Sequence, residues 1–291
     1  MVSSRGHLLT EQNNPNSLNL DQLSSLEIVE LFNREDANTL QAINNAREQI
    51  AAAIDLTSVA LKQGGRLFYV GAGTSGRLGV LDAAECPPTF CTPPSLVQGI
   101  IAGGERALVE SSEGLEDRRE DGARAIAERG VNHKDVVCGI TAGGTTPYVH
   151  GALEAAQNQA AKTIFLACVS EKEVSVNVDV EIRLLVGAEV LAGSTRLKAG
   201  TATKMALNIL STGVMVKLGK VYGNRMIDVA VTNQKLRDRA LRILQDLTPL
   251  SREEASILLE KSGNRVKVAL LMQWKGLSAT EAEAVINDQS E

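Results

Sequence analysis

The sequence predicts an α/β fold: a parallel sheet that is preceded by N-terminal helices and followed by a small three-helix unit. Between residues 66 and 218, short and nearly continuous apolar runs alternate with helical patterns. Strands buried on both faces of a parallel sheet have this texture. Helical periodicity precedes this region, and helix-capping signals follow it. A chain of 291 residues has room for one large domain, alone or with a small appendage.

The N-terminal part is predicted to contain an arm and then helices. Residues 1–20 are rich in Asn, Ser and Gln, which indicates an extended arm. Residues 23–32 place five apolar side chains on one helical face, and residues 37–62 contain neither Gly nor Pro. The pair Gly64-Gly65 is expected to end this helical part.

The central part is predicted to alternate strands and helices. Pro87-Pro88 is expected to stop the first of these helices. The predicted strands are residues 66–70, 96–102, 135–140, 163–169 and 178–186, and the predicted helices are residues 77–85, 109–129, 147–160 and 201–218.

Three short helices are predicted after Leu250. The segments 251–254 and 278–281 both have the Ser-x-x-Glu spacing of a capping box. Asn264 is placed to cap the middle helix, and Gly263 and Gly276 separate the three. About forty residues make a unit of marginal stability on its own.

Composition argues against several classes of partner. The chain has 30 Lys and Arg against 35 Asp and Glu, a net charge of −5, and only three Tyr, four Phe and one Trp. It therefore lacks the basic surface and the stacking aromatics of a nucleic-acid-binding protein. No run of 18 apolar residues indicates a membrane span, and the polar N-terminus does not resemble a signal peptide. We expect a cytoplasmic protein without nucleic-acid or membrane partners.

A metal centre is not expected. The cysteines at 86, 91, 138 and 168 match no zinc spacing, and the three histidines are scattered. Reduced thiols packed as small apolar side chains are the simplest interpretation.

Two glycine-rich loops follow predicted strands and open predicted helices. The first, residues 71–76 (GAGTSG), has the G-x-G-x-x-G spacing of dinucleotide-binding proteins, but the next strand ends without an acidic residue. A phosphate monoester, held by backbone N–H groups and hydroxyls, fits better. The second loop, residues 141–146 (TAGGTT), follows the third strand. Tight turns and helix caps are the alternative, but two loops at equivalent places favour a ligand site.

Carboxyl groups near these loops are candidates for acid–base chemistry. Glu85 closes an apolar helix, where partial desolvation would raise its pKa; an exposed helix end is the alternative. The segment 110–120 is dense in charge, and a solvated helix explains it equally well. Lys198, in the polar segment 194–201, is either a cation for the phosphate or a surface lysine.

Five motifs together resemble the N-acetylmuramic acid 6-phosphate etherase family, from about residue 5 to the end of the chain. They are residues 69–79 (YVGAGTSGRLG), 84–89 (AECPPT), 113–117 (EGLED), 146–149 (TPYV) and 195–201 (TRLKAGT). The family has the sugar-isomerase (SIS) phosphosugar-binding fold and is related to the glucokinase regulatory protein.

The resemblance implies both an architecture and a reaction. Residues 1–63 form an arm and helices that pack on an SIS domain at 64–245, and residues 246–291 form a tail that resembles a ubiquitin-associated (UBA-like) domain. The family works as a homodimer without metal or organic cofactor in cell-wall sugar recycling. It cleaves the D-lactyl ether by elimination and water addition, giving N-acetylglucosamine 6-phosphate and D-lactate.

The resemblance also implies roles for individual residues. Glu85 is the proton donor, and Glu116 is the other catalytic residue and the base at C2. The second loop departs from the family pattern Ala-Ser-Gly-Arg-Thr-Pro-Tyr, because a serine and an arginine are missing; which hydroxyls bind phosphate is left open. The expected substrate-binding residues are Gly73, Thr74, Ser75, Gly76, Thr141, Gly143, Gly144, Thr145, Thr146 and Lys198.

Two other functions fit the same fold. A phosphosugar isomerase needs a base at C2 but no acid at the C3 ether, so Glu85 distinguishes the two. A non-catalytic phosphosugar sensor needs neither carboxyl group.

Overall fold

The computed structural model describes residues 5–111 and 114–288, and the chain divides into two compact units. The first comprises Met1–Ala84 and Ser95–Gly213, and the second Glu85–Pro94 and Val214–Glu291. The predicted boundaries at residues 63 and 245 remain a prediction. Within the described residues, no helix is long and apolar enough to cross a membrane.

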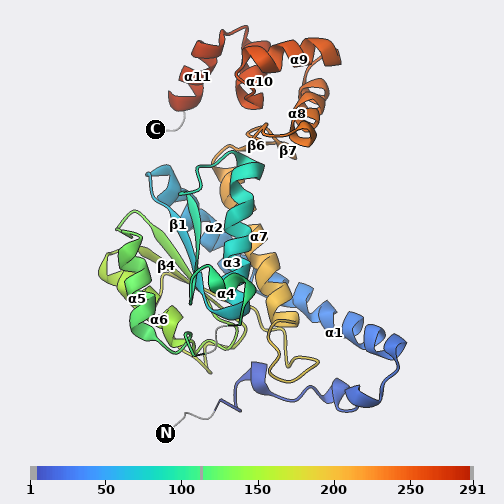
Figure 1. The fold of residues 1–291 in the computed structure, drawn as a ribbon, viewed down its shortest axis with the longest axis vertical. Coiled ribbons are helices and arrows are strands. Elements are labelled where there is room, and N and C mark those ends of the chain that lie inside the picture. Colours follow the sequence, from blue (N-terminus) through green and yellow to red (C-terminus); the bar gives the residue numbers. More distant parts are fainter. Residues whose placement is uncertain (1–4, 112–113, 289–291) are drawn as a thin grey trace. The chain divides into compact units, whose positions relative to one another are not determined.

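The first unit is built on a parallel sheet with the order β2-β1-β3-β4-β5, which confirms the predicted α/β fold (Figure 1). The central strands are buried on both faces, as their apolar sequences require. The strands are β1 (Leu67–Gly71), β2 (Val97–Ile101), β3 (Val136–Ile140), β4 (Lys162–Ala167) and β5 (Val180–Arg183).

Helices cover both faces of this sheet. Figure 1 shows α5 (Arg119–Glu128) and α6 (Pro147–Asn158) on one face, and α3 (Gly73–Phe90) and α7 (Lys198–Lys217) on the other. Helices α5 and α6 can approach closely because Gly122 has no side chain. A Cβ atom at this position would lie only 1.9 Å from the carbonyl oxygen of Tyr148. Helices α3 and α7 are joined at Asp82, which accepts hydrogen bonds from Asn208 and Ser211.

The N-terminal region differs in detail from the prediction. The arm is not extended but forms three 3-10 turns, Leu9–Glu11, Pro15–Ser17 and Leu20–Gln22. The arm packs against the sheet domain, because the side chain of Leu8 is buried in the hydrophobic core. Two helices follow, and the break between them lies at Ala46 rather than between residues 32 and 37. They are α1 (Ser25–Asn45) and α2 (Arg47–Lys62).

Two predicted helices are wrong in extent. Helix α3 begins inside the first glycine loop and continues through Pro87-Pro88 to Phe90. The prolines lie in its last turn, where the N–H of Cys91 still bonds to the carbonyl of Pro87. The predicted helix 109–129 is instead α4 (Arg106–Val109), a loop and α5. In that loop Gly114 has the left-handed φ of +80°, which interrupts a helix.

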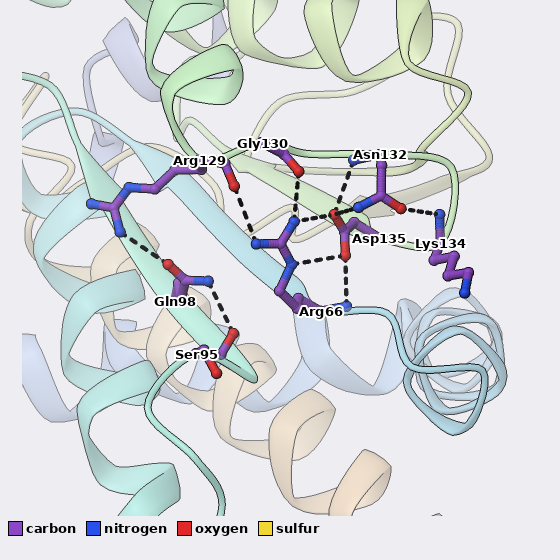
Figure 2. Close-up of polar contacts among 8 residues, drawn as sticks. All are labelled: Arg66, Ser95, Gln98, Arg129, Gly130, Asn132, Lys134 and Asp135. Atoms are coloured by element: carbon purple, nitrogen blue, oxygen red, sulfur yellow. Dashed lines mark hydrogen bonds and ion pairs between the residues drawn. The ribbon is translucent and has the colours of Figure 1, made fainter. Parts of the chain in front are cut away.

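The buried carboxylate of Asp135 links the amino ends of β1 and β3 through hydrogen bonds (Figure 2). Asp135 accepts hydrogen bonds from the backbone and the guanidinium of Arg66, and from the backbone and side-chain amides of Asn132. The Arg66–Asp135 ion pair measures 2.7 Å, and the Asp135 side chain is only 1% exposed. This network stabilises the edge of the sheet opposite to the glycine loops.

The second unit contains the predicted tail helices and more. Helices α9 (Arg252–Lys261), α10 (Val266–Lys275) and α11 (Ala279–Asp288) are present, and both predicted capping boxes form. Asn264 does not cap α10: it has a left-handed φ of +63°, and Arg265 is the capping position. The unpredicted helix α8 (Gln234–Leu247) shares a core with α9 and α10. A short hairpin, β6 (Val221–Tyr222) and β7 (Arg225–Met226), precedes it.

Candidate active site

The strand order brings the two glycine loops together. Strand β1 lies between β2 and β3. The chain therefore runs from β1 to β2 on one side of it and later returns to β3 on its other side. Gly71 at the end of β1 is paired in register with Ile140 at the end of β3. The loops that follow therefore start side by side at the carboxyl edge. This is the switch point at which open parallel sheets bind ligands.

A cavity of about 270 Å³ lies at this edge. Its walls are the two loops, the first turns of α7, part of the N-terminal arm and the loop before α5. Most of the predicted site residues line it: Gly73, Thr74, Ser75, Glu116, Thr141, Gly143, Thr145 and Thr146.

The first loop presents the N-terminus of α3 to the cavity. Residues 73–75 form its first turn, whose N–H groups have no acceptors within the helix and therefore suit an anion. Gly76, also predicted to bind substrate, is not among the residues that line the cavity. Its N–H already donates to the carbonyl of Ala72, and a Cβ atom there would lie 2.6 Å from Ile101 and 2.7 Å from the oxygen of Gly71.

The second loop is held in shape by its own side chains. The hydroxyls of Thr141 and Thr146 share a hydrogen bond of 2.8 Å. Gly144 has a φ of +75°, and its carbonyl oxygen lies 2.7 Å from Nε2 of His150. Gly144 therefore shapes the loop, and the neighbouring Gly143 and Thr145 face the cavity.

Glu116 reaches the cavity from the loop before α5. Its side chain is exposed, and its carbonyl oxygen accepts a 2.9 Å hydrogen bond from the backbone N–H of Tyr148, in the first turn of α6. The loop is thus fixed through its backbone, and the carboxyl group stays free to meet a ligand. Glu113 of the same motif lies outside the described residues.

Glu85 is not among the residues that line the cavity. It is exposed near the end of α3, which is the second of the two alternatives for this residue, an exposed helix end. It belongs to the second unit, whereas all the described residues that line the cavity belong to the first.

Lys198, the predicted cation for the phosphate, is likewise not among the residues that line the cavity. It forms a 2.7 Å ion pair with Glu35, and both side chains are buried. Nearby, the buried carboxylate of Glu189 accepts the N–H groups of Lys198 and Ala199 at 3.0 and 2.9 Å. Burial raises the pKa of Glu189, and these N–H groups oppose the shift. The first N–H groups of α7 are therefore already bound by the chain's own carboxylate, which leaves α3 and the second loop for an external anion.

The prediction missed the contribution of the N-terminal arm. Arg5, Leu8 and Glu11 line the cavity, as do Thr195 and Thr203 near the start of α7. In the arm the only sequence signal was polarity, which most loops share. Among the residues that the structure describes, no cluster of three His, Cys, Asp or Glu side chains is arranged to hold a metal ion.

The parallel sheet with its cavity at the switch point, together with the family model that residues 49–157 match, places this unit in the SIS class of α/β proteins. Residues 49–157 match the family model of the glucokinase regulatory protein N-terminal SIS domain, and residues 223–270 match that of its C-terminal lid domain. A solved phosphoheptose isomerase from Francisella tularensis is similar over 66% of this chain and 98% of its own, with 20% identity and a TM-score of 0.51. This likeness shows the fold alone.

Closer relatives identify the family. The N-acetylmuramic acid 6-phosphate etherase of a Picosynechococcus species is 75% identical over 97% of this chain and 94% of its own length. That of Rippkaea orientalis is 70% identical over 99% and 94%. The chain belongs to the N-acetylmuramic acid 6-phosphate etherase family and is an enzyme, a carbon–oxygen lyase.

Proposed function

We propose that the protein cleaves the D-lactyl ether of N-acetylmuramic acid 6-phosphate with water, giving N-acetylglucosamine 6-phosphate and D-lactate. The observation that carries this proposal is the cavity at the switch point, which combines a helix N-terminus and hydroxyls with the carboxyl group of Glu116. The first two suit a phosphate monoester, and the third suits proton transfer.

The phosphate binds at the two glycine loops. Residues 73–75 of the first loop and Ala142, Gly143, Thr145 and Thr146 of the second line the cavity, and they offer backbone N–H groups and hydroxyls as donors. Neutral donors at a helix N-terminus hold a phosphate dianion without a paired lysine, which agrees with the burial of Lys198 against Glu35.

Cleavage proceeds by elimination because an ether oxygen is a poor leaving group. In the open-chain sugar, the C1 aldehyde acidifies the proton on C2. Glu116 removes that proton while Glu85 protonates the lactyl oxygen as its bond to C3 breaks. Water then adds to C3 of the enal, with both proton transfers reversed. The reaction requires one carboxylate and one carboxylic acid, and neither a metal nor an organic cofactor.

The proposed setting is the recycling of cell-wall sugars in the cytoplasm by a homodimer. The names of the close relatives support the etherase over a phosphosugar isomerase or a non-catalytic sensor.

A D-lactate-coupled assay tests the proposal. The purified protein is incubated with N-acetylmuramic acid 6-phosphate in the presence of EDTA, and we expect stoichiometric D-lactate and N-acetylglucosamine 6-phosphate. In ¹⁸O-labelled water, the label enters the sugar at C3 and not the lactate. Folded protein that releases no lactate contradicts the function, and label in the lactate contradicts elimination.

A further inference from the structure

We propose that Arg5 of the N-terminal arm binds the carboxylate of the lactyl group and thereby distinguishes the substrate from the sugar product. This inference rests on the proposed function and adds to it a residue that determines specificity. The substrate carries two anionic groups, the phosphate and the lactyl carboxylate, whereas N-acetylglucosamine 6-phosphate carries the phosphate alone. The glycine loops account for the phosphate, so the second anion needs a partner of its own.

The cavity offers one cation for this second anion. Arg5 is the only Lys, Arg or His among the described residues that line the cavity. The carboxyl groups of Glu11 and Glu116, which also line it, repel an anion, and the ammonium of Lys198 is already paired with Glu35. A carboxylate that enters without a partner loses hydration and gains nothing in return. The charges of the cavity therefore assign the lactyl carboxylate to Arg5.

Arg5 lies beside the loop that carries Glu116. Its Nη2 atom is 4.0 Å from Oδ1 of Asp117, the residue that follows Glu116. At this distance the two groups attract one another but do not form a hydrogen bond. The Arg5 side chain is 49% exposed, and a guanidinium group can bind a carboxylate through two parallel N–H groups. The guanidinium is thus available to a ligand next to the proposed base.

The covalent structure of the substrate keeps the lactyl carboxylate close to this base. Four bonds join C2, from which Glu116 takes the proton, to the carboxyl carbon of the lactyl group. Three bonds of an extended chain cover about 3.8 Å, so four cover about 5 Å. Eight bonds separate the same carbon from the phosphorus, which is about 10 Å when the chain is extended. A cation beside Glu116 is therefore placed for the carboxylate, while the phosphate occupies the glycine loops.

The arm is fixed close to Arg5, so this residue forms part of the cavity wall. The carbonyl oxygen of Arg5 accepts a 3.0 Å hydrogen bond from the N–H of Leu8, whose side chain is only 1% exposed. The N–H of Leu9 donates to Oε1 of Glu173 at 2.6 Å. The other oxygen of Glu173 accepts the N–H and the hydroxyl of Ser170, both at 2.7 Å. These contacts hold the backbone of the arm and leave the guanidinium for the ligand.

The variant Arg5→Met tests the inference. We expect its KM for N-acetylmuramic acid 6-phosphate in D-lactate release to rise by about tenfold to a hundredfold, the effect of losing hydrogen bonds to a charged group. Its affinity for N-acetylglucosamine 6-phosphate, measured by calorimetry, should equal that of the wild type. Arg47→Met, which removes an exposed arginine that is paired with Glu48 at 3.3 Å, is the matched control and should leave both constants unchanged.

A modified substrate provides a second measurement. In the lactamide form of N-acetylmuramic acid 6-phosphate, a neutral amide replaces the carboxylate. The wild type and Arg5→Met should have the same KM for this compound, because the charge that Arg5 recognises is absent. A difference as large as the one for the natural substrate would show that Arg5 acts on another part of the sugar, and it would overturn the inference.

The remaining results are equally distinct. Equal weakening of substrate and product binding would assign Arg5 to the phosphate, and unchanged binding of both would leave Arg5 as a surface partner of Asp117; either result overturns the inference. Wild-type protein that releases no D-lactate contradicts the proposed function instead. Calorimetry with the two sugar phosphates then still decides whether Arg5 distinguishes them.

Discussion

The ammonium group of Lys198 lies 2.7 Å from Oε2 of Glu35, with side-chain exposures of 1% and 5%. Asn14 and Asn16 of the N-terminal arm donate to the same carboxylate at 2.6 and 2.8 Å. The arm, α1 and the start of α7 therefore meet at one buried charge pair. Since Gly200, two residues further along α7, lines the cavity, this pair fixes one wall of the site.

Glu35→Gln and Lys198→Met are each expected to lower the free energy of unfolding by about 3–5 kcal/mol, because each leaves one buried charge without its partner. The double variant is expected to lose less free energy of unfolding than the two single variants together, because it leaves no unpaired buried charge. Urea unfolding of the four proteins measures the coupling. Additive losses would show that the two side chains do not depend on one another.

The same pair predicts a loss of stability in acid. Burial by itself raises the pKa of Glu35, but hydrogen bonds from Lys198, Asn16 and Asn14 outweigh it and hold the pKa below its usual value of 4.5. A lowered pKa in the folded state stabilises the protein above pH 4.5, and this contribution disappears as the pH falls through the lower value. Urea titrations from neutral to acidic pH should show a smaller loss for Glu35→Gln than for the wild type. If the free energy of unfolding falls equally steeply with pH in both proteins, other carboxylates cause the acid sensitivity.

Thr74→Val and Ser75→Ala are expected to weaken binding of N-acetylglucosamine 6-phosphate by about tenfold to a hundredfold each, because hydrogen bonds to charged groups contribute about 1.5–3 kcal/mol. Both side chains line the cavity beside the N-terminus of α3. Isothermal titration calorimetry measures the affinity, and Ser95→Ala, an exposed change before β2, is the control. Unchanged affinity in both variants would show that these hydroxyls cap the helix and do not bind the phosphate.

The sequence was sufficient to predict the sheet and the two glycine loops at its carboxyl edge. A strand such as β1, buried on both faces, needs an unbroken apolar run, and residues 66–70 supply one. The loops 71–76 and 141–146 need glycine and hydroxyl residues after strands, which is a local signal. Their meeting at one edge follows from strand order, which the alternation of elements already favoured.

Other features depend on distant partners that local pattern does not reveal. Lys198 is separated from Glu35 by 163 residues, and nothing near either residue marks the pairing. The charged run 109–129 has helical composition, and only tertiary structure shows the loop that carries Glu116. Whether Glu85 is buried likewise depends on what covers α3, which composition cannot state.

Gly122→Ala is expected to lower the free energy of unfolding by about 1–3 kcal/mol or more, because the added Cβ atom would meet the carbonyl oxygen of Tyr148 at 1.9 Å. Helices α5 and α6 must then separate, and the backbone bond from Tyr148 to Glu116 shifts with them. We expect a lower kcat as well as a lower melting temperature. Gly6→Ala, where a Cβ atom meets nothing within 4 Å, is the control. A variant with unchanged stability would contradict the observed close packing.

Glu116→Gln is expected to lower kcat for D-lactate release by about 10²–10⁴-fold, the usual contribution of a general base. Binding of N-acetylglucosamine 6-phosphate should be retained, because the loop is held by the backbone carbonyl of residue 116 and not by its side chain. Incubation of this sugar phosphate with the enzyme in D₂O gives a second measurement: the wild type exchanges the C2 proton, and the variant does not. Glu128→Gln, an exposed change on α5, is the matched control. A variant that still exchanges the C2 proton at the wild-type rate would assign the base to another group, and Glu11, the other carboxyl group among the described residues that line the cavity, would be the next to replace.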